Sequence, residues 1–216
     1  MERIGNLPIE IPRREVYRYM GYKNGETPDE EAGRIIEDCI RILQETAVCS
    51  GIYRRDPLLR DGERPENMVI AGGIDVSSKS LEQNLRRCNE TILVAATLSA
   101  GVDVLLRRYS GLDVMRALTL QAASAAMIEA YLDALEENLL ASLSKEGLAL
   151  RPRFSPGFGD FGTEYQGKVL DALQAGKLLG IRQALDSDMM IPSKSVTALM
   201  GVCKMGDTRV DREIQG

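Results

Sequence analysis

Residues 90–99, ETILVAATLS, form an almost continuous apolar run of strand length. A strand with one face in water alternates apolar and polar residues, whereas a strand covered on both faces is apolar nearly throughout. The run therefore predicts a strand near the centre of a sheet, with other structure packed on both of its faces.

The segments around this strand predict helices and further strands in irregular alternation. The helix expected over 27–47 begins with a threonine cap, a proline and three acidic residues, and its apolar residues then recur at helical spacing. Further helices are expected at 77–88, 101–109, 113–145 and 164–179, and further strands at 48–56, 66–73 and 195–203. No βαβ unit repeats, so the pattern predicts an α+β fold.

The helix expected over 113–145 has a cluster of alanines, Ala122, Ala123, Ala125 and Ala126. Small side chains let neighbouring backbone approach closely, so this helix should lie inside the fold. A length of 216 residues favours one unit over 1–206, followed by a polar tail over 207–216 that is expected to fray.

Charge and hydropathy exclude two classes of partner. A formal net charge of −5 provides no positive field for a nucleic-acid backbone. No apolar run approaches the roughly 20 residues of a membrane span, and the first residues carry charges throughout. We therefore expect a cytoplasmic protein that binds neither nucleic acid nor membrane.

The cysteine and histidine content limits the chemistry. The four cysteines show no CxxC pair, so we expect them to be reduced and buried: Cys39, Cys49, Cys88 and Cys203. The chain has no histidine, which removes Ser/His and Cys/His nucleophilic machinery and histidine-based metal sites. Neither a metal site nor a catalytic side chain is predicted.

Residues 151–162, RPRFSPGFGDFG, gather all three phenylalanines of the chain with two prolines and three glycines. The prolines oppose regular structure, and the glycines permit close approach of another molecule to the backbone. Arg153 can hold a carboxylate with two hydrogen bonds, and Phe158 can cover an apolar ligand surface. A rigid turn, whose phenylalanines fill the core and whose arginine pairs with a nearby acid, explains the same residues.

Over most of its length the chain resembles the activation domain of cobalamin-dependent methionine synthase. The resemblance rests on these segments: EVYRYMGYKNGETPDEE, ETILVAATLSAGVD, AASAAMIEAYLDALEENL, RPRFSPGFGDF and LDALQAGKLLGIRQALDSDMMIPSKSVTALMGV. It implies an α+β fold with a twisted antiparallel sheet and surrounding helices. It also implies S-adenosylmethionine as the cofactor, bound at Glu129, Arg153, Ser155, Gly157 and Phe158.

The resemblance further implies a free-standing reactivation module in methionine biosynthesis, that is, a methyltransferase component. Such a module supports reductive methylation of cob(II)alamin carried by a separate cobalamin-binding methionine synthase, with a flavodoxin-like electron donor. Where the family loop usually has tyrosine this chain has Phe158, and a ligand-contacting family tyrosine after the last strand has no counterpart in CKMGDTRV. Two alternatives stay open: a docking or regulatory protein with a decayed ligand site, and a module for another corrinoid methyltransferase.

Overall fold

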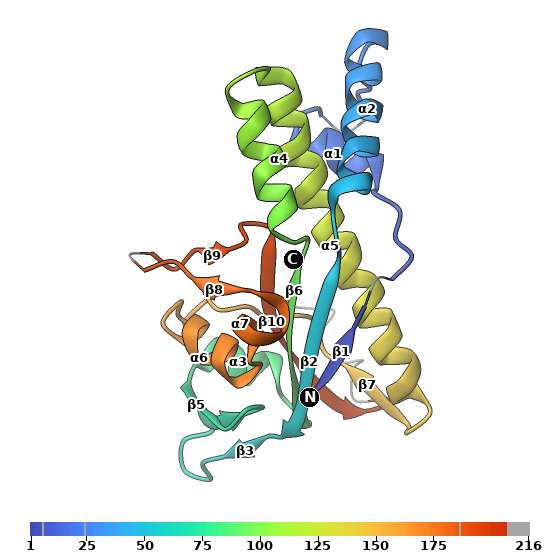
Figure 1. Ribbon diagram of the computed structural model, residues 1–216. Coiled ribbons are helices and arrows are strands. Elements are labelled where there is room, and N and C mark those ends of the chain that lie inside the picture. Colours follow the sequence, from blue (N-terminus) through green and yellow to red (C-terminus); the bar gives the residue numbers. More distant parts are fainter. Residues whose placement is uncertain (6, 24, 186, 207–216) are drawn as a thin grey trace.

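The apolar run at 90–99 is the core of β6, the middle strand of a five-stranded antiparallel sheet in the computed structural model of the chain (Figure 1). The structure describes residues 1–5, 7–23, 25–185 and 187–206, so the tail expected over 207–216 lies outside it. In spatial order the strands are β1 (Glu2–Ile4), β2 (Ser50–Pro57), β6 (Cys88–Thr97), β10 (Ser195–Lys204) and β7 (Leu148–Leu150).

Side chains of β6 alternate between two separate apolar cores. Ile92, Val94 and Ala96 belong to one core, and Leu93 and Ala95 belong to the other. All five are buried, because a strand paired on both edges and covered on both faces has no contact with water. This confirms the central strand that the sequence predicts, and the α+β fold class with a curled antiparallel sheet is confirmed as well.

Four helices build the first core and extend beyond one end of the sheet (Figure 1). They are α1 (Arg13–Tyr19), α2 (Glu30–Thr46), α4 (Ala100–Ser110) and α5 (Val114–Ser144). Helix α2 begins later than expected from the sequence, because Asp29 and not Thr27 caps it, accepting a hydrogen bond from Ala32 N at 2.8 Å. Asp113 caps α5 in the same way.

Helix α5 lies against the sheet, as its alanines predict. At Gly51 in β2 an added Cβ would come within 2.8 Å of Leu135 Cδ1, so glycine allows the helix its close approach. Tyr131 is fully buried, and its hydroxyl donates to the carbonyl oxygen of Gly5 at 2.8 Å. The middle of α5 is therefore fixed against both β2 and the chain after β1.

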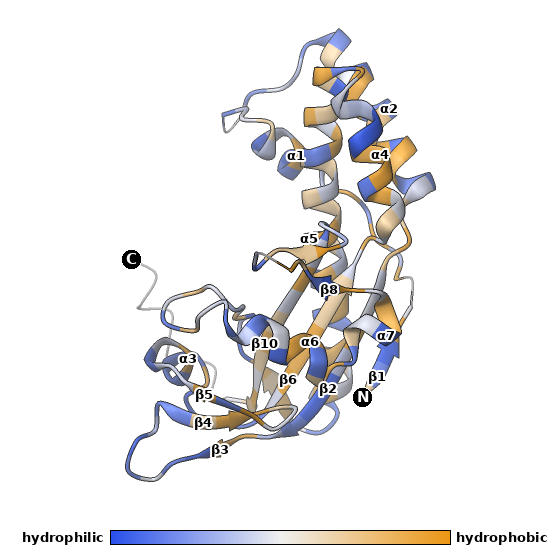
Figure 2. Cartoon of the chain, turned by 60° about the vertical axis from the view of Figure 1, so that its left-hand side comes forward, coloured by the Kyte–Doolittle hydropathy of each residue, from blue (hydrophilic) through white to orange (hydrophobic). Residues whose placement is uncertain are grey.

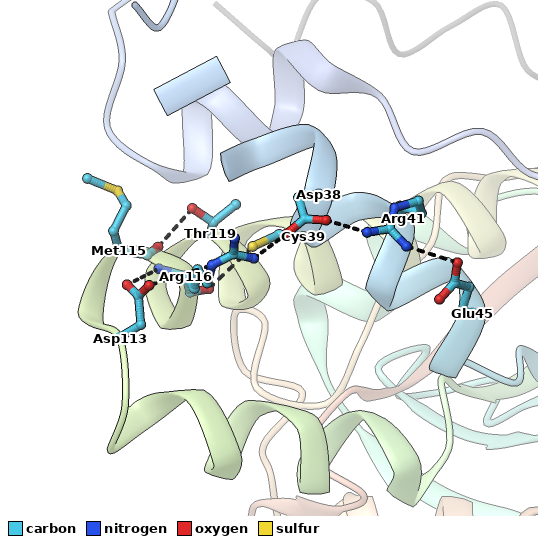
Figure 3. A network of polar contacts seen from close by, with 8 residues as sticks. All are labelled: Asp38, Cys39, Arg41, Glu45, Asp113, Met115, Arg116 and Thr119. Carbon is cyan, nitrogen blue, oxygen red and sulfur yellow. Dashed lines mark hydrogen bonds and ion pairs between the residues drawn. The ribbon is translucent and has the colours of Figure 1, made fainter. Parts of the chain in front are cut away.

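An ion pair holds the first turn of α5 to α2 (Figure 3). The guanidinium of Arg116 donates to Asp38 on α2, and Asp38 also accepts from Arg41. The hydrogen bond from Arg116 is the main reason that the pKa of Asp38 lies below its ordinary value. This end of α5 is thus anchored by charge and the middle by apolar packing.

The second core lies between the opposite face of the main sheet and a layer of short elements. These are β3 (Leu59–Arg60), β4 (Asn67–Ile70), β5 (Ile74–Ser77), α3 (Lys79–Asn84), α6 (Tyr165–Ala172), α7 (Ala175–Leu179), β8 (Arg182–Gln183) and β9 (Met190–Ile191). Figure 2 shows apolar colour on β4 and β6, whereas the loop that joins β3 to β4 is hydrophilic. The single helix expected over 164–179 is wrong: Gln174 takes a left-handed conformation, with φ of 49°, and divides the segment into α6 and α7.

All four cysteines are free and buried, in agreement with the prediction. Burial raises the pKa of Cys39 and Cys49 to about 11 and that of Cys88 to about 12, so these thiols stay protonated at neutral pH. Within the described ranges, no helix combines the length and apolar character needed to cross a membrane.

Candidate functional site

The loop that follows β7 begins as an extended edge of the main sheet. Arg151 N donates to Gly201 O at 2.8 Å, and Phe154 exchanges two backbone hydrogen bonds with Leu199, each 2.8 Å long. Pro152, which lies between them, has no N–H to donate, and proline is tolerated at the edge of a sheet. Segment 151–154 therefore runs beside β10 and is held in place by it.

A tight turn follows, and it sends the three phenylalanines to different environments. Gly157 has a φ of 99°, and its N donates to Phe161 O at 2.7 Å to close the turn. Phe161 is 0% exposed and stacks on Tyr165, with ring centroids 5.2 Å apart. Phe158 at the tip is 63% exposed and lies 6.1 Å from the Phe154 ring. The turn thus has a buried aromatic anchor and an exposed aromatic tip.

Asp160 fastens the far side of this turn to the start of α3. Its carboxylate accepts hydrogen bonds from Ser78 Oγ at 2.6 Å, from Lys79 N at 2.8 Å and from Ser80 N at 3.0 Å. These bonds, led by that of Ser78, hold the pKa of Asp160 well below its ordinary value. Next to it, Gly159 has a φ of 55°, and an added Cβ would lie 2.5 Å from Ser80 Oγ. The turn is consequently fixed on two sides.

Arg153 points from this loop toward the middle of α5. Its guanidinium donates to Asp133 Oδ1 at 2.7 Å, to Glu136 Oε2 at 3.1 Å and to Glu129 Oε2 at 3.4 Å. Spacings of four and three residues put the three carboxylates on one face of the helix. One guanidinium therefore meets three acidic groups.

This cluster carries an excess of negative charge in a partly buried place. The Arg153 side chain is only 23% exposed, and burial raises the pKa of Glu136 above its ordinary value. A guanidinium has five N–H donors, and the three contacts use only Nη1 and Nη2. Among the described residues Nε has no acceptor, so the cluster can still receive a carboxylate while its acidic excess attracts a cation.

Two of the residues predicted from the sequence, Glu129 and Arg153, are brought into contact. Ser155, Gly157 and Phe158 form the turn next to Arg153, and Ser155 O accepts from Phe158 N at 3.1 Å. Contact of these five residues with a ligand stays a prediction.

Sequence reasoning missed three residues of the arrangement, Asp133, Glu136 and Asp160. The first two follow Glu129 at helical spacing, so the signal was present in the sequence. Nothing local marks Asp160 as the residue that holds α3, because its partners lie 80 to 82 residues earlier in the chain.

Comparison with solved structures finds a fold similar to this one. The chain resembles a crystal structure of the MetH reactivation domain bound to AdoHcy, with a TM-score of 0.66, and the match covers 93% of this chain and 77% of that chain. Only 14% of the aligned residues are identical, so this likeness shows the fold alone. No protein-family model matches the sequence, and no curated protein matches it.

Proposed function

We propose that the chain binds S-adenosylmethionine at the loop after β7 and supports the reductive methylation of cob(II)alamin on a separate cobalamin-dependent methionine synthase. A flavodoxin-like protein would donate the electron. The observation that carries the proposal is the contact of Arg153 with Glu129 on α5, in a loop whose exposed tip is Phe158. It is supported by the likeness of the fold to a domain solved with AdoHcy, the demethylated form of the same ligand.

The charges of the cluster suit this ligand. S-adenosylmethionine carries a carboxylate, an ammonium and a sulfonium, so it is a cation overall. Nε of Arg153 offers a donor to the carboxylate, while Glu129 and Asp133 offer acceptors to the ammonium. Phe158 is exposed at the tip of the turn and can cover the apolar part of the ligand.

In this proposal the residues of the chain bind and orient, and none of them forms a bond with the methyl group. The sulfonium supplies a methyl group that the reduced cobalamin of the partner can accept, and the C–S bond electrons stay on sulfur. No general base is needed for such a transfer, which is consistent with a chain that lacks histidine. Rigidity of the loop, given by Asp160 and Phe161, would keep the ligand in a fixed orientation.

Titration calorimetry with S-adenosylmethionine tests the binding step. We expect saturable binding with one site per chain, and Arg153→Lys should weaken it because an ammonium cannot reproduce the planar fork of guanidinium. Arg64→Lys is the matched control, since Arg64 is an exposed loop residue far along the chain from the site. Equal affinity of the protein and Arg153→Lys would contradict the proposed site.

A reconstituted reaction tests the second step. A cob(II)alamin-loaded methionine synthase, a reductant and S-adenosylmethionine should form methylcobalamin at a rate that rises with the concentration of this protein. Glu129→Gln should slow the reaction at low ligand concentration and much less at saturation, because the lost carboxylate acts in binding. The same rate without this protein would contradict the proposal.

One observation favours a second candidate, a docking or regulatory protein for a corrinoid methyltransferase. The guanidinium of Arg153 already has three carboxylate partners, which a structural role explains without a ligand. Under this reading calorimetry would detect no S-adenosylmethionine binding, whereas the protein would still bind a corrinoid protein in sedimentation experiments.

A further inference from the structure

A hollow lies between the end of α1 and the first half of α5, away from the loop after β7. Its volume is ≈ 530 Å³, which is in the range of pockets for small organic molecules. The lining combines aromatic, apolar and small residues, among them Tyr19, Met115 and Ala125, with Gln121 and two charged residues, Glu26 and Lys194.

Helix α5 provides most of the apolar part of the lining. Leu118 and Met115 are exposed although they are large apolar residues, and Ala125 leaves space because its side chain is small. The ion pair between Arg116 and Asp38 fixes the turn of α5 that carries them, and Figure 3 shows Met115 pointing away from that pair. The helix turn that contributes Met115 and Leu118 to the hollow is therefore held in place on α2.

The ammonium of Lys194 is the cation of the cavity, and it lacks a close counter-ion. Within the described residues its Nζ makes no hydrogen bond and no ion pair, and burial lowers its pKa. The charge of Asp103 raises the pKa of Lys194, but among the described residues that carboxylate forms no ion pair with it and accepts from Ser193 N at 2.9 Å and from Ser193 Oγ at 2.6 Å. Glu26, the other charged residue of the lining, accepts from Lys23 N.

We propose that this cavity binds a small organic anion, with its aromatic or aliphatic body between α1 and α5 and its carboxylate, phosphate or sulfonate on Lys194. A partly buried ammonium gains from an anionic partner, and tyrosine and methionine side chains pack well on a flat apolar body. S-adenosylmethionine is a cation and suits the acidic cluster at Glu129, which lies one helical turn beyond Ala125. The two sites adjoin on α5 but select ligands of opposite charge.

The test compares two fluorescent probes that share an aromatic body, anilinonaphthalene sulfonate and the uncharged phenylnaphthylamine. The protein should bind both, and Lys194→Met should raise the Kd for the sulfonate about tenfold while leaving the Kd for the uncharged probe unchanged. Lys194→Arg should restore sulfonate binding. Lys204→Met, at an exposed lysine, is the matched control and should change neither Kd.

A variant that fills the hollow provides a second test of the proposal. Ala125→Phe should abolish binding of both probes, with circular dichroism and melting temperature measured to show that the variant folds. Unchanged sulfonate affinity in Lys194→Met would overturn the proposal, and so would an equal loss in Lys204→Met. Displacement of the sulfonate probe by S-adenosylmethionine would overturn the assignment of a separate site.

Discussion

Arg153 Nη2 lies 2.7 Å from Asp133 Oδ1 and so joins the loop after β7 to the middle of α5. Glu129 and Glu136 flank Asp133 on the same helix face, and each also accepts from the guanidinium. Without Arg153 the three carboxylates would repel one another, and Glu136 would keep a half-buried charge without its counter-ion. The loop is therefore held to the helix by charge as well as by backbone pairing.

Replacing Arg153 should lower the free energy of unfolding, and a second substitution at Asp133 should reverse part of that loss. We expect Arg153→Ala to lower the free energy of unfolding by about 1–2 kcal/mol, between the values for exposed and buried ion pairs. Adding Asp133→Asn should recover part of that loss, because it removes one of the repelling charges. Urea unfolding of the two single variants and the double variant measures the coupling. Additive losses would show that the two side chains act independently.

Phe158 and Phe161 form a matched pair for separating ligand binding from folding. Phe161→Ala should lower the free energy of unfolding by about 3–4 kcal/mol, because it leaves a cavity in the second core. Phe158→Ala should change stability by less than about 0.5 kcal/mol, since that ring is exposed. The same substitution should weaken S-adenosylmethionine binding in calorimetry about five- to tenfold. A ligand affinity unchanged in Phe158→Ala would remove the tip of the turn from the proposed site.

The sequence predicted the fold best where a pattern has one structural explanation. Residues 90–99 are apolar nearly throughout, and the strand they form is buried on both faces. The helix that breaks at Gln174 was not predictable, because the left-handed residue is a glutamine and the nearest glycine, Gly176, lies two residues later inside α7. Long-range structure overrides local preference at this point of the chain.

The candidate site was predicted in its parts but not in its connections. Composition placed three phenylalanines in one loop, but which ring is buried depends on the turn closed by Gly157 and Phe161. Arg153 was expected either to bind a ligand or to pair with a nearby acid, and the acids that it contacts lie 17 to 24 residues earlier on α5. Such contacts between distant segments cannot be predicted from spacing alone, because the packing angle of the helix decides them.

Gly51 should be sensitive to a single added methyl group. Its Cβ position lies 2.8 Å from Leu135 Cδ1 and 3.3 Å from the hydroxyl oxygen of Tyr131, so α5 or its side chains must shift. We expect Gly51→Ala to lower the free energy of unfolding by about 1–3 kcal/mol, the usual cost of overpacking. Gly62→Ala is the control, since no atom lies within 4 Å of its Cβ position. Thermal unfolding should give Gly51→Ala a clearly lower melting temperature than Gly62→Ala. Equal melting temperatures would show that α5 can move away from Gly51 at no cost in stability.

Asp160 should make the stability of the protein depend on pH in the acid range. Its pKa is lowered in the folded state, first by the hydrogen bond from Ser78 and then by the amides of Lys79 and Ser80. The folded protein therefore binds a proton at this group less readily than the unfolded chain, whose Asp has a pKa of about 3.9. The stabilisation is complete above that value and is lost as the pH falls below it toward the folded pKa.

Urea unfolding of the protein and of Asp160→Asn between about pH 7 and about pH 3 measures this effect. The difference in the free energy of unfolding should be largest near neutral pH and should narrow below about pH 4, where the unfolded carboxyl is protonated. Ser78→Ala removes the strongest of the three donors, so the pKa of Asp160 followed by carbon NMR should rise toward its ordinary value in that variant. A difference that stays constant across this range would mean that the loop is held to α3 by contacts other than the charge on Asp160.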